Sequence, residues 1–385
     1  MNFVVFAPNP WHDLWRNRQQ IFSRLAARQH RVLYVEPARA SLADWRRGRV
    51  APAQVRGPAL VQERPNLALY RIPALLPTRA TGDRFDQTSD RGLAWHLRHT
   101  LRTLNFTDPV LWLYRPARWQ WAAQAIPHRL LVYHITDDYA AFAHLDDAAR
   151  AALLVEERGL LAAADLTLVT APRLLEIKGP AARHSVLVAN GVDVTAFQRA
   201  AMTAPRPAVP RLGYSGHVSA RLDLPLLREL AMARPDWLFE FAGSEWDVGV
   251  AEELAALKAL PNVLFRGLLP VEAVPDFVAS LAVGLIPYRV TDETRAISSL
   301  KLYEYLAAGR PVVSARVPAA EAHADVVRMA DATVATWVEQ IDAALREAND
   351  PTLVAARQAV AAQNTWHQRV NEIEQALKDV LAQTV

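Results

Sequence analysis

Short apolar runs alternate with helical patterns along this chain of 385 residues. In the first half, runs rich in β-branched and aromatic residues predict strands, and stretches such as 18–28 and 148–163 predict helices between them. The predicted strands are 3–7, 31–35, 67–72, 110–114, 130–135, 166–169 and 185–188. This alternation predicts an α/β fold with parallel sheets.

A segment rich in proline and small residues, at 200–210, interrupts the pattern and is typical of an interdomain linker. After it the alternation restarts. Strands are expected at 211–215, 237–242, 262–266, 282–286 and 311–314, and helices at 224–233, 250–260, 271–280 and 300–308. A chain of this length exceeds the size at which one core stops growing, which also favours two domains.

The predicted organisation is an N-terminal domain at 1–203, a C-terminal domain at 204–365 and a terminal helix at 366–385. The terminal helix is amphipathic, with Val370, Ile373 and Leu377 on one face, and we expect it to pack back towards the N-terminal domain. Two α/β domains leave a cleft between the carboxyl ends of their sheets, where such folds bind ligands.

Composition adds a location and a possible surface contact. The chain has no cysteine, no apolar run of the roughly 20 residues that span a bilayer, and no signal-peptide pattern, so we expect a cytoplasmic protein. The net charge of +3 hides a basic stretch at 1–60, with arginines and tryptophans but few acidic residues. Such a surface can contact anionic lipid at the inner face of the membrane or a phosphate-bearing acceptor, and a solvated basic face is the alternative. No nucleic-acid-binding motif accompanies the charge.

The strongest chemical pattern is RAISSLKLYEYLAAGRPVVS at 295–314. Ser298 and Ser299 stand at the start of a predicted helix, where serine caps free N–H groups that can also bind a diphosphate. Lys301 in the first turn is unfavourable unless an anion compensates it. Glu304 lies roughly 7 Å further along the helix axis, a distance that suits ribose hydroxyls. An ordinary amphipathic helix closed by Gly309 is the alternative, but it leaves Lys301 and Glu304 unexplained.

Two residues near predicted strand ends are further donor candidates. Gly216 follows the strand 211–215 and is expected where the backbone approaches the phosphates. Tyr288 follows the strand 282–286 and can project towards the nucleotide, although a packed loop aromatic is an equal alternative.

Five segments occur in a recognisable order: NGVDVTAF (190–197), GYSG (213–216), FEFAGSEWD (239–247), NVLFRGLLP (262–270) and LKLYEYLAAGRPVVS (300–314). The series resembles that of B-type glycosyltransferases, in particular the retaining group 1 family and its relatives in bacterial polysaccharide assembly. WRNRQQ (15–20) and VYHITDDYAAF (132–142) resemble the N-terminal half of a capsule and exopolysaccharide branch. The resemblance implies two Rossmann-like domains and a sugar donor linked to a nucleoside diphosphate, without an obligatory metal.

The sequence departs from the family pattern at two places. The retaining family carries a second glutamate eight residues before the position of Glu304, where this chain has Ala296. The family's arginine and lysine after the glycine turn are also missing, so His217, Arg221 and Lys301 are the candidates to hold the diphosphate. The serine and lysine that open the helix also resemble xanthan-type inverting glucuronosyltransferases, which leaves retention or inversion open. The expected donor set is completed by Gly243, Ser244 and Glu245 near the base, and by Arg295 and Leu300.

Catalytic candidates follow the predicted strand 130–135. An inverting transfer needs a general base, whereas a retaining transfer needs a group that stabilises an oxocarbenium-like centre. Asp137 and Asp138 lie just past the strand, and we expect one of them to be catalytic and the other to cap a helix that begins near Tyr139. Asp138 is slightly favoured. His134 is a third candidate, with a core histidine as the commoner interpretation.

Acceptor contacts are expected from the loop after the first strand. His12, Asp13 and Trp15 belong to this loop, and Arg18 follows closely. These side chains can contact a sugar or phosphate of the acceptor, although Arg18 can equally pack on its own helix.

The sequence therefore predicts a metal-independent glycosyltransferase that uses a UDP- or GDP-linked sugar. Its expected acceptor is a growing bacterial glycan, including one on a polyprenyl-diphosphate carrier. A nucleotide-sugar 2-epimerase shares the two-domain plan and is one alternative. A non-catalytic protein that binds sugar nucleotides is the other, because Ala296 and the missing arginine and lysine weaken the family pattern.

Overall fold

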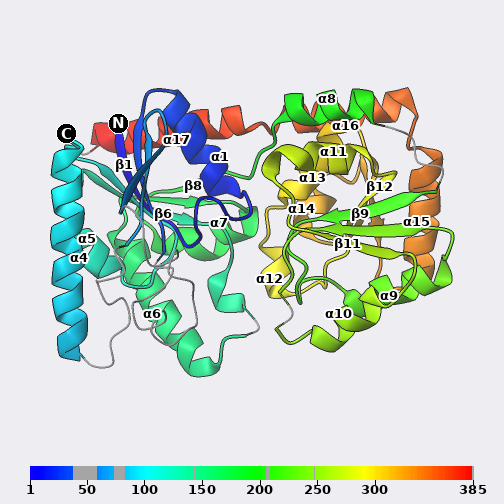
Figure 1. The fold of residues 1–385 in the computed structure, drawn as a ribbon, viewed down its shortest axis with the longest axis horizontal. Coiled ribbons are helices and arrows are strands. Elements are labelled where there is room, and N and C mark those ends of the chain that lie inside the picture. The colour runs from blue at the N-terminus through cyan, green and yellow to red at the C-terminus, as the bar shows by residue number, and fades with distance from the viewer. Residues whose placement is uncertain (38–58, 73–82, 143, 205–208, 247, 384–385) are drawn as a thin grey trace. The chain divides into compact units, whose positions relative to one another are not determined.

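The computed structural model describes residues 1–37, 59–72, 83–142, 144–204, 209–246 and 248–383 (Figure 1). Its contacts divide the chain into two compact units. Unit 1 comprises Met1–Val188 and Val370–Val385, and unit 2 comprises Ala189–Arg369. The sequence placed the boundary at 203/204. The difference arises because helix α8 (Val194–Thr203) packs on helices of unit 2, with Phe197 in the apolar core of that unit.

Unit 1 contains a sheet of eight strands in the order β3-β4-β2-β1-β5-β6-β7-β8. The strands are β1 (Asn2–Phe6), β2 (Arg31–Val35), β3 (Leu60–Arg64), β4 (Leu67–Tyr70), β5 (Val110–Leu113), β6 (Leu130–Ile135), β7 (Leu166–Val169) and β8 (Ser185–Leu187). All neighbouring strands are parallel except β3 and β4. Every strand predicted in this half is present, and β3 was missed.

The helices of unit 1 follow its strands in the chain. They are α1 (Asn17–Ala27), α4 (Asp83–Thr103), α5 (Trp119–Ala125), α6 (Asp147–Ala163) and α7 (Pro172–Lys178), with the short turns η1 (Tyr139–Ala141) and η2 (Gly179–Ala181). Helix α17 (Trp366–Gln383) enters unit 1 from Val370 onward. There the Glu374 carboxylate pairs with Arg28 at 2.6 Å and with His30 at 2.7 Å.

Unit 2 contains a parallel sheet of six strands in the order β11-β10-β9-β12-β13-β14. They are β9 (Arg211–Ser215), β10 (Leu238–Ala242), β11 (Val263–Gly267), β12 (Val283–Ile286), β13 (Val312–Ala315) and β14 (Val327–Ala330). The strand order reverses between β9 and β12, and such a switch point is where open α/β sheets bind ligands.

Helices cover both faces of this sheet. They are α8, α9 (Leu224–Ala233), α10 (Ala251–Lys258), α11 (Val274–Ala279), α12 (Asp292–Arg295), α13 (Leu300–Ala307), α14 (Pro318–Glu321), α15 (Val334–Arg346) and α16 (Pro351–Ala362), with the turn η3 (Val271–Ala273). In Figure 1, α8, α11 and α13 lie on one side of the strands, and α9 and α10 lie on the other. Both units therefore have the α/β, Rossmann-like architecture that the sequence predicted.

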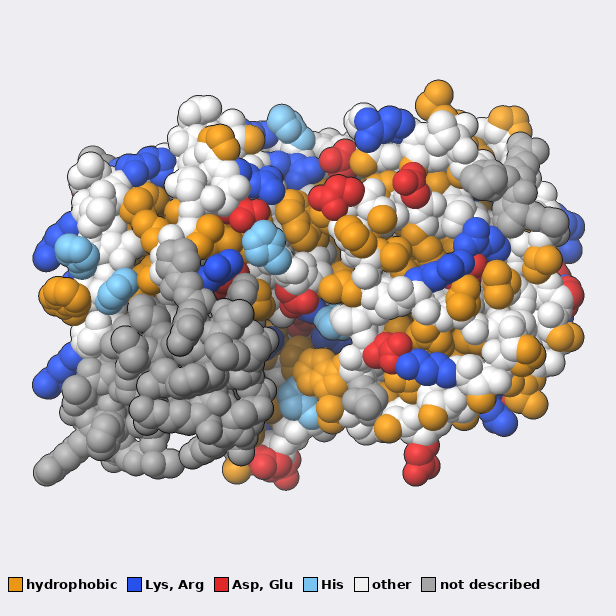
Figure 2. Space-filling model, in the orientation of Figure 1, with side chains coloured by type: hydrophobic (Ala, Val, Ile, Leu, Met, Phe, Trp, Pro, Cys, Tyr) orange, Lys and Arg blue, Asp and Glu red, His pale blue; other side chains and the backbone are white. Residues whose placement is uncertain are grey.

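The charged surface is mixed. Figure 2 shows Lys and Arg side chains at several separate places on the described part of one face, with acidic and apolar side chains between them. Much of the basic stretch at 1–60 lies outside the described residues, including Arg46, Arg47 and Trp45. Among the helices that are described, none combines the length and apolar character needed to cross a membrane.

Candidate functional site

The N-terminus of helix α13 lacks a side-chain cap. Ser299 is its N-cap residue, but the Ser299 hydroxyl makes no capping hydrogen bond and is buried without a partner. Ser298 Oγ instead accepts from the backbone N–H of Asn190 at 3.1 Å, and Asn190 Nδ2 donates to the Ser298 carbonyl at 2.7 Å. The prediction that these serines cap the helix is therefore wrong. Asn190 fixes the loop, so the serine hydroxyls leave the first N–H groups of α13 to another acceptor.

Lys301 is a buried cation in the first turn of α13, with 9% of its surface exposed. Its Nζ donates to the Tyr288 hydroxyl at 2.7 Å and lies 4.8 Å from the ring centre of Tyr214. Among the described residues, Lys301 forms no ion pair with a carboxylate. A phenol and aromatic faces stabilise a cation but do not neutralise it. The arrangement therefore leaves a positive charge beside an open helix N-terminus.

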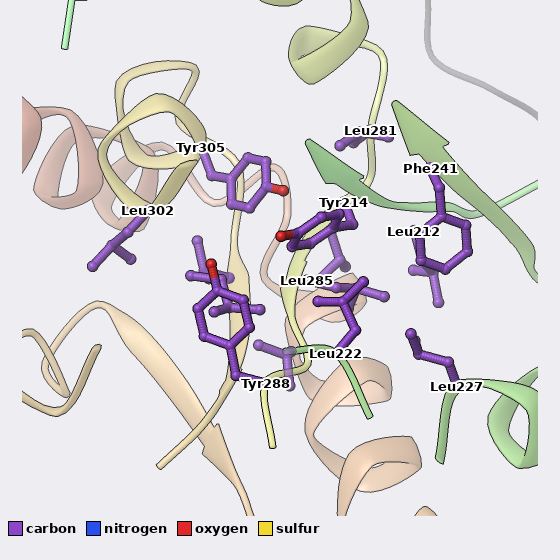
Figure 3. Packing of buried hydrophobic residues seen from close by; sticks show 14 of the residues in the cluster. Leu212, Tyr214, Leu222, Leu227, Phe241, Leu281, Leu285, Tyr288, Leu302 and Tyr305 are labelled. Carbon is purple, nitrogen blue, oxygen red and sulfur yellow. The ribbon is translucent and has the colours of Figure 1, made fainter. Parts of the chain in front are cut away.

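Tyr214 and Tyr288 contact this charge, and Tyr305 lies near these two tyrosines (Figure 3). Figure 3 shows the hydroxyls of Tyr214, Tyr288 and Tyr305 pointing into one region between β9, α13 and the segment after β12. The Tyr305 hydroxyl accepts from the backbone N–H of Ser215 at 2.9 Å. Burial alone would raise the pKa of Tyr288, but Lys301 and Arg221 outweigh burial and lower it. Tyr288 thus contacts Lys301, the cation that is predicted to hold the diphosphate, and does more than pack in a loop.

The loops after β9 and β10 approach each other closely. Gly216 has φ +137°, and a Cβ added there would lie 3.1 Å from Lys301 Cε. Gly243 has φ +150°, and a Cβ there would lie 1.9 Å from the Gly216 carbonyl oxygen, so no larger residue fits. Across these loops, Ser244 Oγ bonds His217 Nδ1 at 2.7 Å. The structure therefore brings Gly216, Gly243, His217 and Ser244 together next to Lys301.

Glu304 lies one turn after Lys301 on α13 and is half-buried. Its carboxylate makes no hydrogen bond or ion pair with the described residues. Burial raises the pKa of Glu304 to about 7, and Lys301 offsets only part of that effect. An unpartnered carboxyl at this depth is suited to accept hydrogen bonds from a ligand once it is ionised.

Other predicted donor residues already have protein partners or lie at the margin. Arg221 pairs with Glu293 at 2.5 Å, and Glu245 pairs with Lys258. The Arg221 guanidinium and the Glu245 carboxylate would therefore contact a donor while keeping their partners Glu293 and Lys258. Arg295 is exposed at the end of α12, and Leu300 is the first residue of α13.

In unit 1, Asp138 lies after β6 in a group of buried charges. Asp138 Oδ1 is 3.0 Å from the Nζ of Lys178, which lies 2.7 Å from Glu157 Oε2. The Tyr133 hydroxyl donates to Glu157 Oε1 at 3.0 Å. Asp138 occupies the N-cap position of η1, yet its side chain makes no capping bond. The sequence missed Lys178 and Glu157, which lie on separate helices and belong to no motif.

The neighbouring candidates differ in their surroundings. Asp137 Oδ2 accepts from the Thr136 hydroxyl at 3.0 Å. His134 is fully buried and stacks on Tyr114, with ring centres 5.0 Å apart. Burial, with a smaller contribution from Arg18, lowers the pKa of His134 to about 3, so its imidazole is neutral near pH 7. This environment is that of a core histidine, the alternative named from the sequence.

The loop after β1 is tied down within unit 1. His12 Nε2 is 3.2 Å from Glu63, and Asp13 accepts from Asn9 Nδ2 at 3.1 Å. Trp15 packs against the Trp11 ring. Arg18 is buried, donates to Asn9 Oδ1 and lies 5.0 Å from the ring centre of Tyr114. Arg18 therefore packs inside unit 1, against the loop after β1 and Tyr114 rather than on its own helix, while His12 stays on the surface.

Comparison with known proteins gives a family match that includes helix α13. Residues 224–375 match the family described as "Glycosyl transferase-like". Over 137 residues the chain is 33% identical to TuaH of Bacillus subtilis (strain 168), which is assigned as a teichuronic acid biosynthesis glycosyltransferase. This match covers 34% of each protein, so the chain spans about a third of the length of that relative.

Solved structures resemble the chain over nearly its whole length. Sucrose-phosphate synthase from Thermosynechococcus elongatus aligns over 99% of both chains with a TM-score of 0.72 and 15% identity. Anabaena Alr3699/HepE, in complex with UDP and glucose, aligns over 98% of this chain and 100% of its own, with a TM-score of 0.69 and 13% identity. The predicted resemblance to B-type glycosyltransferases and the two-domain α/β fold are confirmed. The closer similarity to xanthan-type enzymes stays a prediction.

Proposed function

We propose that this protein is a glycosyltransferase that takes a sugar from a UDP- or GDP-linked donor and adds it to a bacterial polysaccharide precursor. The observation that carries this proposal is Lys301, a buried cation without a carboxylate partner among the described residues, at the open start of α13. A bound diphosphate supplies the missing negative charge and accepts hydrogen bonds from the helix N–H groups. The glycosyl transferase-like match over 224–375 includes this helix and supports the proposal.

The rest of the donor fits around that point. Gly216 and Gly243 let the backbone approach the phosphates, and the ionised Glu304 accepts hydrogen bonds from the ribose hydroxyls. Ser244 is the proposed contact to the base, and His217, which is bonded to Ser244, is a proposed contact to the diphosphate. The UDP and glucose bound to HepE support a uridine donor as the first one to test.

In the proposed reaction, an acceptor oxygen bonds to the anomeric carbon while the bond from that carbon to the diphosphate breaks. Lys301 and the start of α13 stabilise the departing diphosphate, because their positive charge lies where the negative charge develops. Asp138 is the proposed carboxylate on the acceptor side. No obligatory metal enters this scheme, so transfer should persist in excess EDTA.

The acceptor is proposed to be a glycan on a polyprenyl-diphosphate carrier at the cytoplasmic face of the membrane. The assigned role of TuaH in teichuronic acid biosynthesis supports a cell-surface polysaccharide. His12, Asp13, Trp15 and Arg18 are the proposed acceptor contacts in unit 1. Flotation with anionic and neutral vesicles tests the membrane part, and equal indifference to both would remove it.

The decisive experiment is a thermal-shift screen with uridine, guanosine and adenosine diphosphate sugars, because a bound donor raises apparent stability. One nucleotide series should stabilise the wild type, and Lys301→Met should reduce the shift at the same nucleotide concentration. Products are then analysed with and without a lipid-linked glycan. A sugar moved to the glycan supports transfer, whereas an altered sugar still on its nucleotide identifies an epimerase. No stabilisation by any nucleotide sugar would contradict the proposal.

A further inference from the structure

The two carboxylate oxygens of Asp138 have different surroundings. Oδ1 is buried and lies 3.0 Å from Lys178 Nζ. Oδ2 has no hydrogen-bond or ion-pair partner among the described residues, and the side chain as a whole is 16% exposed. One oxygen of this carboxylate thus faces Lys178, and the other has no partner in the described part of the chain.

Lys178 is itself fixed at the end of α7. Its Nζ lies 2.7 Å from Glu157 Oε2 on α6, and the Tyr133 hydroxyl on β6 holds the other oxygen of Glu157. Burial alone would lower the pKa of Lys178, but Glu157 and then Asp138 outweigh burial and raise it. Burial and Glu157 raise the pKa of Tyr133 well above its usual value, so its O–H stays a donor. The ammonium therefore remains charged and anchored from three elements.

The structural needs of this cluster do not explain Asp138. Glu157 alone neutralises Lys178, and Glu157 is the more deeply buried of the two carboxylates. Asp138 adds a second negative charge, and this charge is not used to cap η1. Its orientation is set instead by the lysine behind it. The contact at one oxygen fixes the direction of such a carboxylate, and the second oxygen remains for a substrate.

We propose that Lys178 is the positioning residue for the acceptor-side carboxylate, holding Asp138 Oδ1 so that the ionised Oδ2 meets the acceptor hydroxyl. This inference rests on the proposed glycosyl transfer. The acceptor O–H proton passes to Oδ2 as the acceptor oxygen bonds to the anomeric carbon, and the diphosphate leaves with the electron pair of the broken bond. Lys178 keeps its proton throughout and acts only through Asp138.

The test compares Glu157→Gln with Glu157→Gln/Lys178→Met. The first variant leaves Lys178 with Asp138 as its carboxylate partner, and the second removes the buried pair together, which avoids a lone buried charge at Glu157. Donor affinity by calorimetry should be equal in both. The double variant should lose kcat on the order of 10- to 100-fold, which is at most the low end of the roughly 100- to 10,000-fold that proton transfer to a positioned group contributes, because Asp138 itself is kept.

The split between kcat and KM separates positioning from a structural role. KM should be equal in the two variants while kcat falls in the double variant, because Lys178 acts on the direction of Asp138 and not on substrate binding. Glu157→Gln is common to both variants, so the difference between them reports Lys178. Lys378→Met, on the exposed surface of α17, is the lysine control and should change neither kcat nor KM.

Equal kcat in the two variants would overturn the inference, and so would a change in KM with kcat unchanged. Lys178→Arg provides a second decision if the double variant does not fold. A planar guanidinium cannot reproduce the two contacts of a point-like ammonium, so kcat should fall while donor affinity stays unchanged. Wild-type kcat in this variant would also overturn the inference. A wild type that transfers sugar from no donor contradicts the proposed function instead.

Discussion

Two buried lysines, one in each unit, are stabilised in opposite ways. Lys178 in unit 1 has two carboxylates within 3.0 Å, whereas Lys301 in unit 2 has a phenol and aromatic rings but no carboxylate among the described residues. Their exposures are nearly equal, at 7% and 9%. Burial therefore does not distinguish them. The presence or absence of a countercharge does.

The lysine without a carboxylate partner in the described part of the chain is the one at which an anionic ligand is expected. Burying a charge costs free energy unless an opposite charge compensates it. Asp138 and Glu157 compensate the charge of Lys178 within the protein itself. The phenol and aromatic rings stabilise Lys301 only in part. Binding of an anion beside it would therefore lower the free energy further. One lysine is thus part of a complete ionic cluster, and the other is the one at which we propose that a diphosphate binds.

The largest expected effect is on folding. Lys178→Met should lower the free energy of unfolding by about 3–5 kcal/mol, because it leaves Glu157 buried without its cation. Lys301→Met should cost much less, since no carboxylate forms an ion pair with Lys301 among the described residues. Denaturant titration measures both, and adding Glu157→Gln should restore most of the loss at Lys178. Similar losses for the two single variants would end the contrast between the lysines.

Donor affinity should show the reverse order. Lys301→Met should weaken binding of the nucleotide donor by about 1.5–3 kcal/mol, the usual worth of a hydrogen bond to a charged group. Calorimetry with UDP or the donor found by thermal shift measures it. Glu157→Gln/Lys178→Met should bind the donor like the wild type. A donor affinity that survives loss of Lys301 would remove the diphosphate from this end of α13.

The predictable part of the donor site was local in the sequence. Lys301 and Glu304 share one helix, so a cation in the first turn and the spacing to the carboxylate were visible without a fold. The strands were predictable for the same reason, since runs such as 110–114 and 130–135 carry their own apolar pattern. Strand β3 was missed because LVQER is partly polar and pairs antiparallel at the edge of the sheet.

The missed part depends on contacts between distant residues. Lys178 meets Glu157 and Asp138 only because α6 and α7 return to the end of β6. Ser298 was expected to cap α13, but its hydroxyl accepts from Asn190, a partner 108 residues away. The position of Phe197 in the core of unit 2 moved the boundary for the same reason. Single-sequence patterns contain no information about such partners.

The pKa of Glu304, one turn after Lys301, makes both stability and donor affinity depend on pH. Its pKa is about 7 in the folded protein and near 4.5 when unfolded, so the folded state binds more protons between these values. Stability of the free protein should therefore fall as pH rises from about 4.5 to about 7. Donor affinity should rise through pH 7, because only the ionised carboxylate accepts both ribose hydrogen bonds.

Glu304→Gln supplies the control for this behaviour. It removes the titrating group while keeping the shape, so both slopes should flatten by the part that Glu304 contributes. The titration of the nucleotide phosphate is common to the two proteins and cancels when they are compared. Chemical unfolding and calorimetry from pH 5 to 8 measure the two slopes, and identical slopes in wild type and Glu304→Gln would contradict the ribose role.

The smallest expected effect tests whether Gly216 belongs to the Lys301 site. Gly216→Ala should cost about 1 kcal/mol of stability, because its φ of +137° is unfavourable for a residue with a Cβ. The new Cβ would also lie 3.1 Å from Lys301 Cε, which should move the ammonium and weaken donor binding a few-fold. Gly249→Ala is the matched control, since Gly249 also has positive φ, at +76°, but open space around the added Cβ. The two variants should lose similar stability, and only Gly216→Ala should lose donor affinity, so equal affinities would separate the glycine turn from the lysine.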